Sequence, residues 1–466
     1  MHPISVGIDI LLAHCTLGAL LNSKDRFDPP RCDEDTRKGV IADIMQWIRS
    51  TDESASMMVL HGSAGVGKSA LEQTIAELCL KNGLRVASFF FSRGSGGGRA
   101  DGNSLIPTLI YQLLNAIPGL RESILTALEV DPGLLEMARA EQMEKLFVAP
   151  QLALMCNIAS SDGVPPTLPR VPPPHISPIL VTIDGLDECD NHEIQCDLLR
   201  IIADAIPRLP LPFRFLIACR PESHIMNTIN HHGSLKAIAV QRFDLNSVEA
   251  DTDIRLFFIR EFRKIRETHR IGQKLPYDWP TNAVITTLTE NSSGQFIYAS
   301  TVMNYLKYPK DRPERRLEVI LRLSPAREGE KPFAQLDALY KHIFSCVGGI
   351  GLVWLILGII KLYAQGNIPG IDDKDKTFIT PANLDKVLLL RTGDVELALD
   401  ELASVIVIFS EEEPIQILHA SLMDFLLDPK RSCNYNLDLG LAHEALGRWI
   451  ISKSSGKQLL NLFEQD

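Results

Sequence analysis

The feature that most constrains this chain is a glycine-rich segment that follows a short apolar run. Residues 57–61 read Met-Met-Val-Leu-His, and Gly62-Ser-Ala-Gly-Val-Gly-Lys68-Ser69 then has the spacing of a phosphate-binding P-loop. The glycines let the backbone curl so that successive N–H groups point at phosphates, while Lys68 adds a positive charge and Ser69 offers a hydroxyl to Mg²⁺. Apolar residues then recur at helical spacing, so we expect the phosphates at a helix N-terminus.

This motif predicts a nucleoside triphosphate site, with ATP or ADP and Mg²⁺ as the expected cofactors. The sequence does not distinguish ATP from GTP. The residues expected to contact the nucleotide are those of the loop and of the first helical turn: Gly62, Ser63, Ala64, Gly65, Val66, Gly67, Lys68, Ser69 and Ala70.

A second apolar run, residues 178–184, delivers an aspartate at its end and is followed by further acids. We interpret it as a Walker B strand, in which Asp184 holds Mg²⁺ together with Ser69. Asp187 or Glu188 would then polarise the attacking water. Three carboxylates this close together are costly unless a cation is bound, which favours a metal site over an acidic turn.

A third strand is predicted over Phe213–Cys219, and it ends in Arg220-Pro-Glu. An arginine at the C-terminal edge of a strand can reach a γ-phosphate, and its guanidinium is always charged and matches phosphate oxygens in pairs. The expected catalytic residues are therefore Asp187, Glu188 and Arg220.

Charge and cysteine usage restrict the partners and the compartment. The 47 basic residues against 58 acidic residues give a net charge of −11, which argues against a broad nucleic-acid surface. The nine cysteines are scattered without a C-x-x-C pair, which indicates a reducing compartment without a disulfide framework or a cysteine zinc site. We therefore expect a cytoplasmic protein that binds no nucleic acid.

Two apolar stretches could suggest a membrane or a signal segment. The run from Cys346 to Ile360 is shorter than the ~20 residues needed to span hydrocarbon, so we interpret it as a core helix. The stretch from Ile8 to Leu21 lacks a basic start and contains Asp9 and His14, which favours a buried helix over a secretion signal. No membrane span is expected.

Strands alternate with helical patterns up to about residue 245, which predicts an α/β fold with a parallel sheet. An amphipathic helix is expected over 33–49, and strands are expected over 86–91 and 236–240. Residues 93–98 are predicted to form a flexible glycine-rich loop, and the proline-rich residues 164–174 are predicted to form an insertion.

The pattern becomes mainly helical after residue 251. A short strand pair, 405–409 and 415–418, among helices suggests a winged helix. The predicted domains are an N-terminal helical segment (1–30), a nucleotide-binding domain (31–245), a helical domain (246–330), a winged-helix domain (331–435) and a C-terminal helical segment (436–466).

The P-loop, Asp184-Gly-Leu-Asp-Glu188 and Cys219-Arg220-Pro221 together resemble the NACHT domain of the STAND class of signalling P-loop NTPases. Five further segments are similar to the central part of fungal NOD-like receptors, and the likeness covers about residues 31–435. These segments are Ala87-Ser-Phe-Phe-Phe-Ser-Arg93, Leu105-Ile-Pro-Thr-Leu-Ile-Tyr-Gln-Leu113, Trp279-Pro280, Gly294-Gln-Phe-Ile-Tyr-Ala-Ser-Thr-Val302 and His419-Ala-Ser-Leu-Met-Asp-Phe-Leu426.

The resemblance implies a P-loop NTPase sheet of the additional-strand, AAA-like type, followed by a helical domain and a winged-helix domain. It also implies a switch in fungal innate immunity or non-self recognition, in which ADP holds a closed monomer and ATP exchange permits homo-oligomerisation. His419 would match the winged-helix histidine that approaches the β-phosphate. The base-contacting Gly-x-Pro of related proteins is replaced here by Gly294-Gln295-Phe296.

The input and the output of such a switch are not identified by the sequence. We find no WD-type, ankyrin or TPR period and no effector domain before residue 31, so we expect the chain to be the central switch alone, with unknown effector and ligand.

Other functions remain open at this stage. A metabolic kinase would need an acceptor pocket with its own base, and a motor ATPase would need basic or aromatic strand-contacting segments. A winged-helix DNA-binding regulator ranks last because residues 392–403 carry four acids and no base after Arg391.

Overall fold

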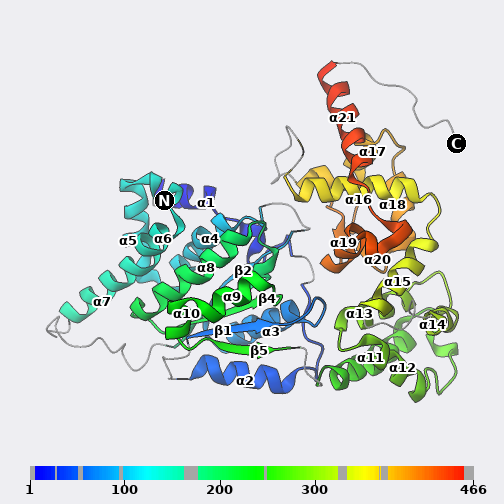
Figure 1. The fold of residues 1–466 in the computed structure, drawn as a ribbon, viewed down its shortest axis with the longest axis horizontal. Coiled ribbons are helices and arrows are strands. Elements are labelled where there is room, and N and C mark those ends of the chain that lie inside the picture. Colours follow the sequence, from blue (N-terminus) through cyan, green and yellow to red (C-terminus); the bar gives the residue numbers. More distant parts are fainter. Residues whose placement is uncertain are drawn as a thin grey trace. The chain divides into compact units, whose positions relative to one another are not determined.

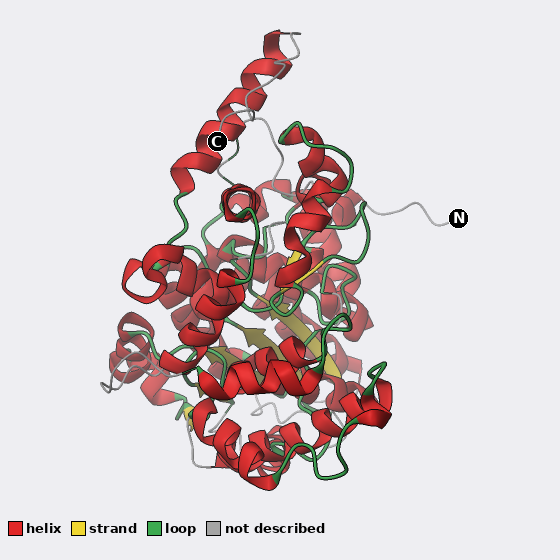
Figure 2. Cartoon of the chain, turned by 90° about the vertical axis from the view of Figure 1, so that its right-hand side faces the viewer, coloured by secondary structure: helices red, strands yellow, loops and turns green. Residues whose placement is uncertain are grey.

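The structure is a computed structural model that describes residues 6–26, 29–50, 56–93, 98–161, 177–245, 249–323, 333–366, 368 and 376–455. The chain divides into two compact units, one formed by Met1–Ser92 with Gly98–Asp253 and the other by Ile254–Asp466 with Arg93–Gly97. In the described residues, strands are confined to one sheet and one short hairpin, and helices form most of the remaining regular structure (Figure 2).

The first unit is an α/β structure. Its strands are β1 (Met57–His61), β2 (Arg85–Phe90), β3 (Ile179–Asp184), β4 (Phe213–Cys219) and β5 (Gln241–Asp244). Its helices are α1 (Val6–Ala13), α2 (Lys38–Arg49), α3 (Lys68–Lys81), α4 (Leu105–Ala116), α5 (Pro118–Val130), α6 (Arg139–Gln142), α7 (Ala149–Ser161), α8 (His192–Ala205), α9 (Ser223–His231) and α10 (Gly233–Ala237).

All five strands are parallel, in the order β2-β3-β4-β1-β5. Strand β4 therefore lies between the P-loop strand β1 and the Walker B strand β3. This insertion defines the additional-strand, AAA-like sheet, so the predicted fold class is confirmed.

Helices cover both faces of the sheet, and alternate residues of each inner strand face opposite layers (Figure 1). In β1, Met57 and Val59 belong to the large core formed with α4, α5 and α8, whereas Met58 and Leu60 belong to the core formed with α2 and α3. Strands that are buried on both faces need mainly apolar sequence, which explains the apolar character of β1, β3 and β4, interrupted inside the last two only by Thr182 and Arg214.

The N-terminal segment is part of the first unit's core. Leu11 of α1 and Ala19 of the short 3₁₀ helix Leu17–Ala19 are fully buried, and the backbone N–H of Leu21 donates to Ser88 Oγ of β2 at 2.9 Å. The prediction of one buried helix over 8–21 is therefore wrong in its extent, because the α-helix ends at Ala13 and the 3₁₀ helix follows it.

The last strand of the sheet was misplaced by the sequence pattern. Residues 236–240, predicted as a strand, belong mostly to the end of α10 and the turn after it, while β5 begins at Gln241 and pairs with β1. Strand β5 is an edge strand, largely exposed and polar, so the apolar signal that marks the inner strands is absent from it.

Two other predicted helices begin later than expected. The 33–49 helix begins only at Lys38, and the apolar helix predicted over 346–360 is α16, Ile350–Ala364. Gly349 precedes α16 with a φ of 72°, a conformation that glycine adopts without strain and that sets the helix start. The segments 94–97 and 164–174 lie outside the described residues.

The second unit is mainly helical. Its helices are α11 (Glu249–Thr268, which begins in the first unit), α12 (Asn282–Ser292), α13 (Phe296–Leu306), α14 (Pro313–Arg322), α15 (Ala334–Ser345), α16, α17 (Pro381–Val387), α18 (Asp394–Leu399), α19 (Ala420–Leu427), α20 (Pro429–Ser432) and α21 (Leu439–Ser455). The antiparallel strands β6 (Ile406–Val407) and β7 (Gln416–Ile417) form the hairpin that was predicted for a winged helix.

Helix α16 is a core helix, as predicted. Val353, Ile356, Leu357, Ile359 and Ile360 are almost completely buried within the chain. Among the described residues, we find no helix with both the length and the apolar character that a membrane crossing requires.

One acidic side chain is enclosed in the first unit's core. Glu72 of α3 is fully buried and hydrogen-bonds to Thr182 of β3. Burial, followed by the nearby Asp184 carboxylate, raises the pKa of Glu72 well above its usual value of 4.5. Because a buried charge is costly, burial favours the neutral form of Glu72, and its hydrogen bond joins the P-loop helix to the Walker B strand.

This burial generates a prediction about pH. As the pH rises through about 4.5, unfolded Glu72 loses its proton before folded Glu72 does, so the free energy of unfolding falls until the raised folded-state pKa is passed. Glu72→Gln stays neutral and should remove this decline. Urea unfolding of both proteins between about pH 5 and pH 8 measures the difference.

Glu77→Gln on the same helix is the matched control. Although burial acts in the opposite direction, hydrogen bonds from Arg31 and Gln73 lower the pKa of Glu77, so its charge stabilises the fold above the unfolded pKa. Its replacement should reduce stability at neutral pH. Parallel pH curves for wild type and Glu72→Gln would contradict the assignment of Glu72 as a buried neutral acid.

Candidate functional site

Three loops that carry predicted site residues meet at one edge of the sheet. The strands β1 and β4 are in register so that His61 pairs with Cys219, and β3 pairs with β4 through Ile183 and Ile217. Because all three strands run in the same direction, the P-loop, Asp184 and Arg220 follow at the same C-terminal edge. In open parallel sheets this edge is where ligands bind.

The P-loop has the backbone that its glycines permit. Gly65 and Gly67 have φ values of 80° and 95°, which favour glycine, and α3 begins directly afterwards at Lys68. Lys68 Nζ donates to the carbonyl oxygens of Gly62 (2.7 Å) and Ser63 (3.0 Å). The lysine therefore folds back over its own loop, at the helix N-terminus that favours anions.

The environment of Lys68 contains opposing influences on its charge. Burial lowers the pKa of Lys68, whereas the carboxylates of Asp187 and Asp184 act to raise it. A bound phosphate would favour the charged amine in the same way as these carboxylates do.

Asp184 is the carboxylate that best fits a cation. It lies at the end of β3 with only 5% of its surface exposed, and burial raises its pKa, whereas a hydrogen bond from Ser69 lowers it. Within the described part of the chain, its Oδ1 atom is buried without a hydrogen-bond partner. A carboxylate oxygen and a hydroxyl side by side are the kinds of ligand that Mg²⁺ prefers, so Ser69 and Asp184 fit the predicted metal role.

Asp187 and Arg220 form a close pair. The backbone N–H of Arg220 donates to Asp187 Oδ1 at 2.8 Å, and the Arg220 guanidinium Nε lies 3.2 Å from Asp187 Oδ2. Asp187 is buried, whereas Glu188 is half-buried. The pair connects the Walker B loop to the end of β4. Both carboxylate oxygens of Asp187 contact Arg220.

A buried glutamine reinforces this connection. Gln195 of α8 has no exposed surface, and its Nε2 donates to the backbone carbonyls of Cys189 (2.7 Å) and Asp187 (3.2 Å). Its Oε1 lies 2.6 Å from Nε2 of His224 on α9. One side chain thus fixes the loop after the Walker B strand and orients a residue on the next helix.

The sequence analysis missed several residues that contact or surround the site. Arg37 donates to the carbonyl of Val66 in the P-loop at 3.2 Å, and Arg26 lies with its guanidinium carbon 3.4 Å from the centre of the Phe90 ring. Burial and the neighbouring Arg99 lower the pKa of Arg26 to about 9. Arg26 and Arg37 lack a sequence signal because neither belongs to a motif with a characteristic spacing.

A sequence signal did exist for Glu72. It lies three residues after Ser69, next to Leu71 and one turn before Ile75 and Ala76, so it occupies the inward face of the P-loop helix.

His419 lies in the second unit, where it precedes α19 as its N-cap residue. Its Nε2 lies 3.2 Å from Ser300 Oγ of α13, and burial lowers the pKa of His419 to about 4. The ring is therefore neutral at pH 7. The predicted contact of His419 with a β-phosphate stays a prediction.

A family model described as Nephrocystin 3, N-terminal, matches residues 41–162. This stretch contains most of α2, the P-loop and the helices up to α7, and it ends before the Walker B strand. No curated protein sequence matches the chain.

Solved structures of ORC and Cdc6 proteins are similar over most of the chain. The ORC2 protein of Aeropyrum pernix in its ADP form is 12% identical, with 92% of this chain and 98% of that chain covered and a TM-score of 0.35. Cdc6p from Pyrobaculum aerophilum is 9% identical, with 92% and 99% covered and a TM-score of 0.34. Drosophila ORC bound to DNA is 9% identical, with 96% and 93% covered and a TM-score of 0.31.

These TM-scores lie below 0.5, so no conclusion about this chain rests on those structures. The P-loop and Walker B residues, the strand order of the sheet and the family-model match are independent of them. Together they show that the first unit has the sheet and the phosphate-binding loop of a P-loop NTPase fold.

Proposed function

We propose that this chain is an ATP- and ADP-binding signalling switch that hydrolyses ATP slowly and acts in the cytoplasm in fungal innate immunity or non-self recognition. The observation that carries the nucleotide role is the convergence of the P-loop, the buried Asp184 and Arg220 at one sheet edge. The signalling role rests on the resemblance to NACHT proteins. The cytoplasmic location rests on the scattered spacing of the nine cysteines, which include no C-x-x-C pair.

The residues divide the task of holding the nucleotide. The backbone N–H groups of residues 62–69 would bind the phosphates, and Lys68 would leave its carbonyl partners to pair with them. Ser69 and Asp184 would hold Mg²⁺, which neutralises phosphate charge and would satisfy the buried Oδ1 atom of Asp184. Arg220 would contact the γ-phosphate when ATP is bound.

The geometry favours different roles for the two acids after Asp184. Asp187 is buried and paired with Arg220, so we assign it the positioning of the arginine. Glu188 is more accessible, and we assign it the orientation of the attacking water. This assignment separates two residues that the sequence left as alternatives.

This assignment predicts how the two isosteric variants differ. Glu188→Gln should bind ATP as wild type does and hydrolyse it about 100-fold more slowly, since general-base catalysis contributes about 10²–10⁴-fold. Asp187→Asn should weaken ATP binding more than ADP binding, because it loosens Arg220. Phosphate release and calorimetric titrations of both nucleotides measure these effects. Full turnover in Glu188→Gln would transfer the water-orienting role to another residue.

The switch requires that the two nucleotides favour different arrangements of the chain. A nucleotide shifts such an equilibrium only through a difference in its affinity for the two arrangements. We propose that His419 favours ADP in the compact arrangement and that Arg220 favours ATP in an open arrangement that forms homo-oligomers. The ligand and the effector that complete the switch are not identified.

The switch predicts a change in particle size. A non-hydrolysable ATP analogue should expand or oligomerise wild type relative to ADP, as measured by small-angle scattering and size-exclusion chromatography. His419→Ala should weaken ADP more than ATP and expand the ADP form, whereas Lys68→Ala should respond to neither nucleotide. Lys81→Ala, on the exposed end of the same helix, is the matched control and should behave as wild type.

Equal radii with ADP and the ATP analogue, together with unchanged nucleotide preference in His419→Ala, would contradict the switch. A nucleotide-binding chain without a conformational response would then remain.

A further inference from the structure

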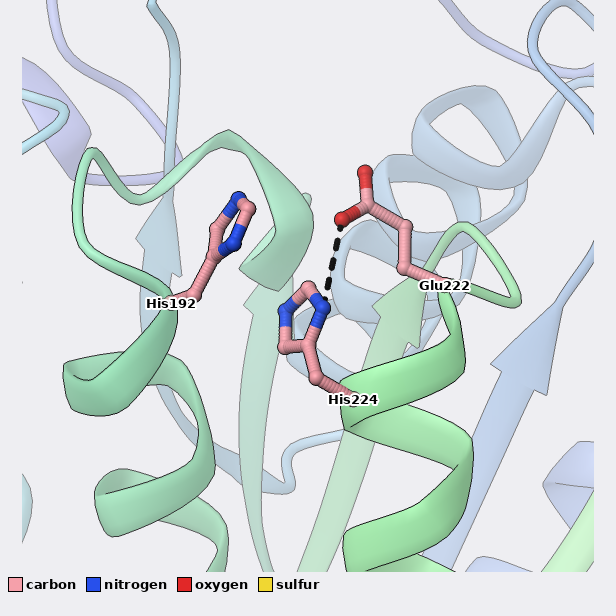
Figure 3. A group of neighbouring side chains, drawn as sticks. All are labelled: His192, Glu222 and His224. Atoms are coloured by element: carbon pink, nitrogen blue, oxygen red, sulfur yellow. Dashed lines mark ion pairs between the residues drawn. The ribbon is translucent and has the colours of Figure 1, made fainter.

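Three side chains of the kinds that can bind metal ions gather at the starts of two neighbouring helices (Figure 3). His192 begins α8, Glu222 precedes α9 as its N-cap residue, and His224 lies in the first turn of α9. One potential ligand atom from each lies within 4.8 Å of the other two. The His224 Nδ1 atom faces Glu222 Oε2 at 3.7 Å, and the cluster uses none of the residues that we assign to the nucleotide.

The hydrogen bond to Gln195 fixes which nitrogen of His224 can bind a metal. The Gln195 amide nitrogen donates to the Asp187 and Cys189 carbonyls, so its Oε1 atom is the acceptor that faces His224 Nε2 at 2.6 Å. His224 Nε2 must therefore carry the proton, and the lone pair lies on Nδ1, toward Glu222. Metal-binding histidines are oriented in this way, by a hydrogen bond from the nitrogen that does not bind the metal.

We propose that His192, Glu222 and His224 form a binding site for a transition-metal dication, with zinc as the fitting ion. Two imidazoles and one carboxylate are zinc ligands, whereas Mg²⁺ prefers oxygen ligands alone. Ligand atoms around tetrahedral zinc lie ~3.3 Å apart, so the cluster has to contract from its present spread. The site is therefore distinct in chemistry from the Ser69 and Asp184 site.

Rotation of His192 provides this contraction. The His192 and His224 rings are stacked with their centres 4.3 Å apart and their planes at 16°, so their lone pairs do not converge on one point. His192 is exposed, and its side chain can turn without disturbing the core, while buried Gln195 holds His224 in place. One anchored and one adjustable ligand suit a site that closes when the ion binds.

The charges around the cluster also restrict which further ligand can complete the coordination of the zinc ion. The positive ends of the α8 and α9 dipoles point toward the cluster, and Glu222 supplies a single negative charge. A water, hydroxide or other anionic oxygen is therefore the favoured remaining ligand. The bound ion would join the start of α8 to the start of α9 and so brace the loops that carry Asp187 and Arg220. The proposal does not depend on nucleotide binding.

The test is a zinc titration of the full chain in excess Mg²⁺ without nucleotide, in competition with a chromophoric chelator. Wild type should bind one zinc ion per chain, and His192→Ala and His224→Ala should each bind it at least about tenfold more weakly. His231→Ala is the matched control, because this exposed residue ends α9 and its ring contacts the Asn227 carbonyl of the same helix. It should bind zinc as wild type does.

Cobalt binding provides a second measurement, which would not change if His192 had only a structural role. Co²⁺ bound by two imidazoles and a carboxylate should give visible absorption bands in wild type and His231→Ala, and the bands should be lost in His192→Ala. Because His192 is exposed, this variant should retain the circular dichroism of wild type. Absence of stoichiometric binding, or equal zinc affinity in all four proteins, would overturn the proposal.

Discussion

Desolvation of the acidic residues beneath the P-loop is the constraint on which the site depends. Glu72 and Asp184 are both buried, and burial raises the pKa of each. A sheet can hold two such groups only if one stays neutral or a cation offsets the charge of the other. Burial and the nearby Asp184 carboxylate raise the pKa of Glu72 and favour its neutral form, against the hydrogen bond from Thr182, whereas Asp184 retains a buried oxygen suited to Mg²⁺.

The same edge of the sheet also carries its own positive charge. Lys68 donates to P-loop carbonyls and Arg220 pairs with Asp187, so each cation already has protein partners. A phosphate ligand therefore competes with internal contacts, and the free energy of binding includes their loss. Nucleotide binding can therefore change the conformation of the loops at this edge of the sheet, because a bound phosphate must rearrange Lys68 and can rearrange Arg220.

The sequence predicted the parts of the molecule where residue type and spacing are both restricted. Glycines 65 and 67 need positive φ, and β3 and β4 need mainly apolar sequence because both of their faces are covered, so the P-loop and these strands were placed correctly. The polar edge strand β5 has no such restriction, and its position was wrong. Boundaries set by single turns, as at Lys38 and Gly349, were also displaced.

The residues of the candidate site also fall into a group that the sequence could predict and a group that it could not. The positions of Lys68, Asp184 and Arg220 could be predicted because each lies at or after the end of a strand at the same edge, while their roles toward a nucleotide stay predictions. The roles of Gln195 and Arg37 could not, since they act through backbone carbonyls that only the folded chain brings near. The different roles assigned to Asp187 and Glu188 likewise depend on burial and on the contact with Arg220. Neither can be deduced from the spacing of residues in the sequence.

The central claim is that the backbone of residues 62–69 binds the phosphates of a nucleotide. Hydrogen exchange followed by mass spectrometry, with and without ADP and Mg²⁺, observes these amides directly. The account predicts that exchange of the peptide covering 62–69 slows by at least about tenfold on nucleotide addition in wild type and Lys81→Ala, but not in Lys68→Ala. Unchanged exchange of that peptide at saturating nucleotide would contradict the assignment of the P-loop as the binding site.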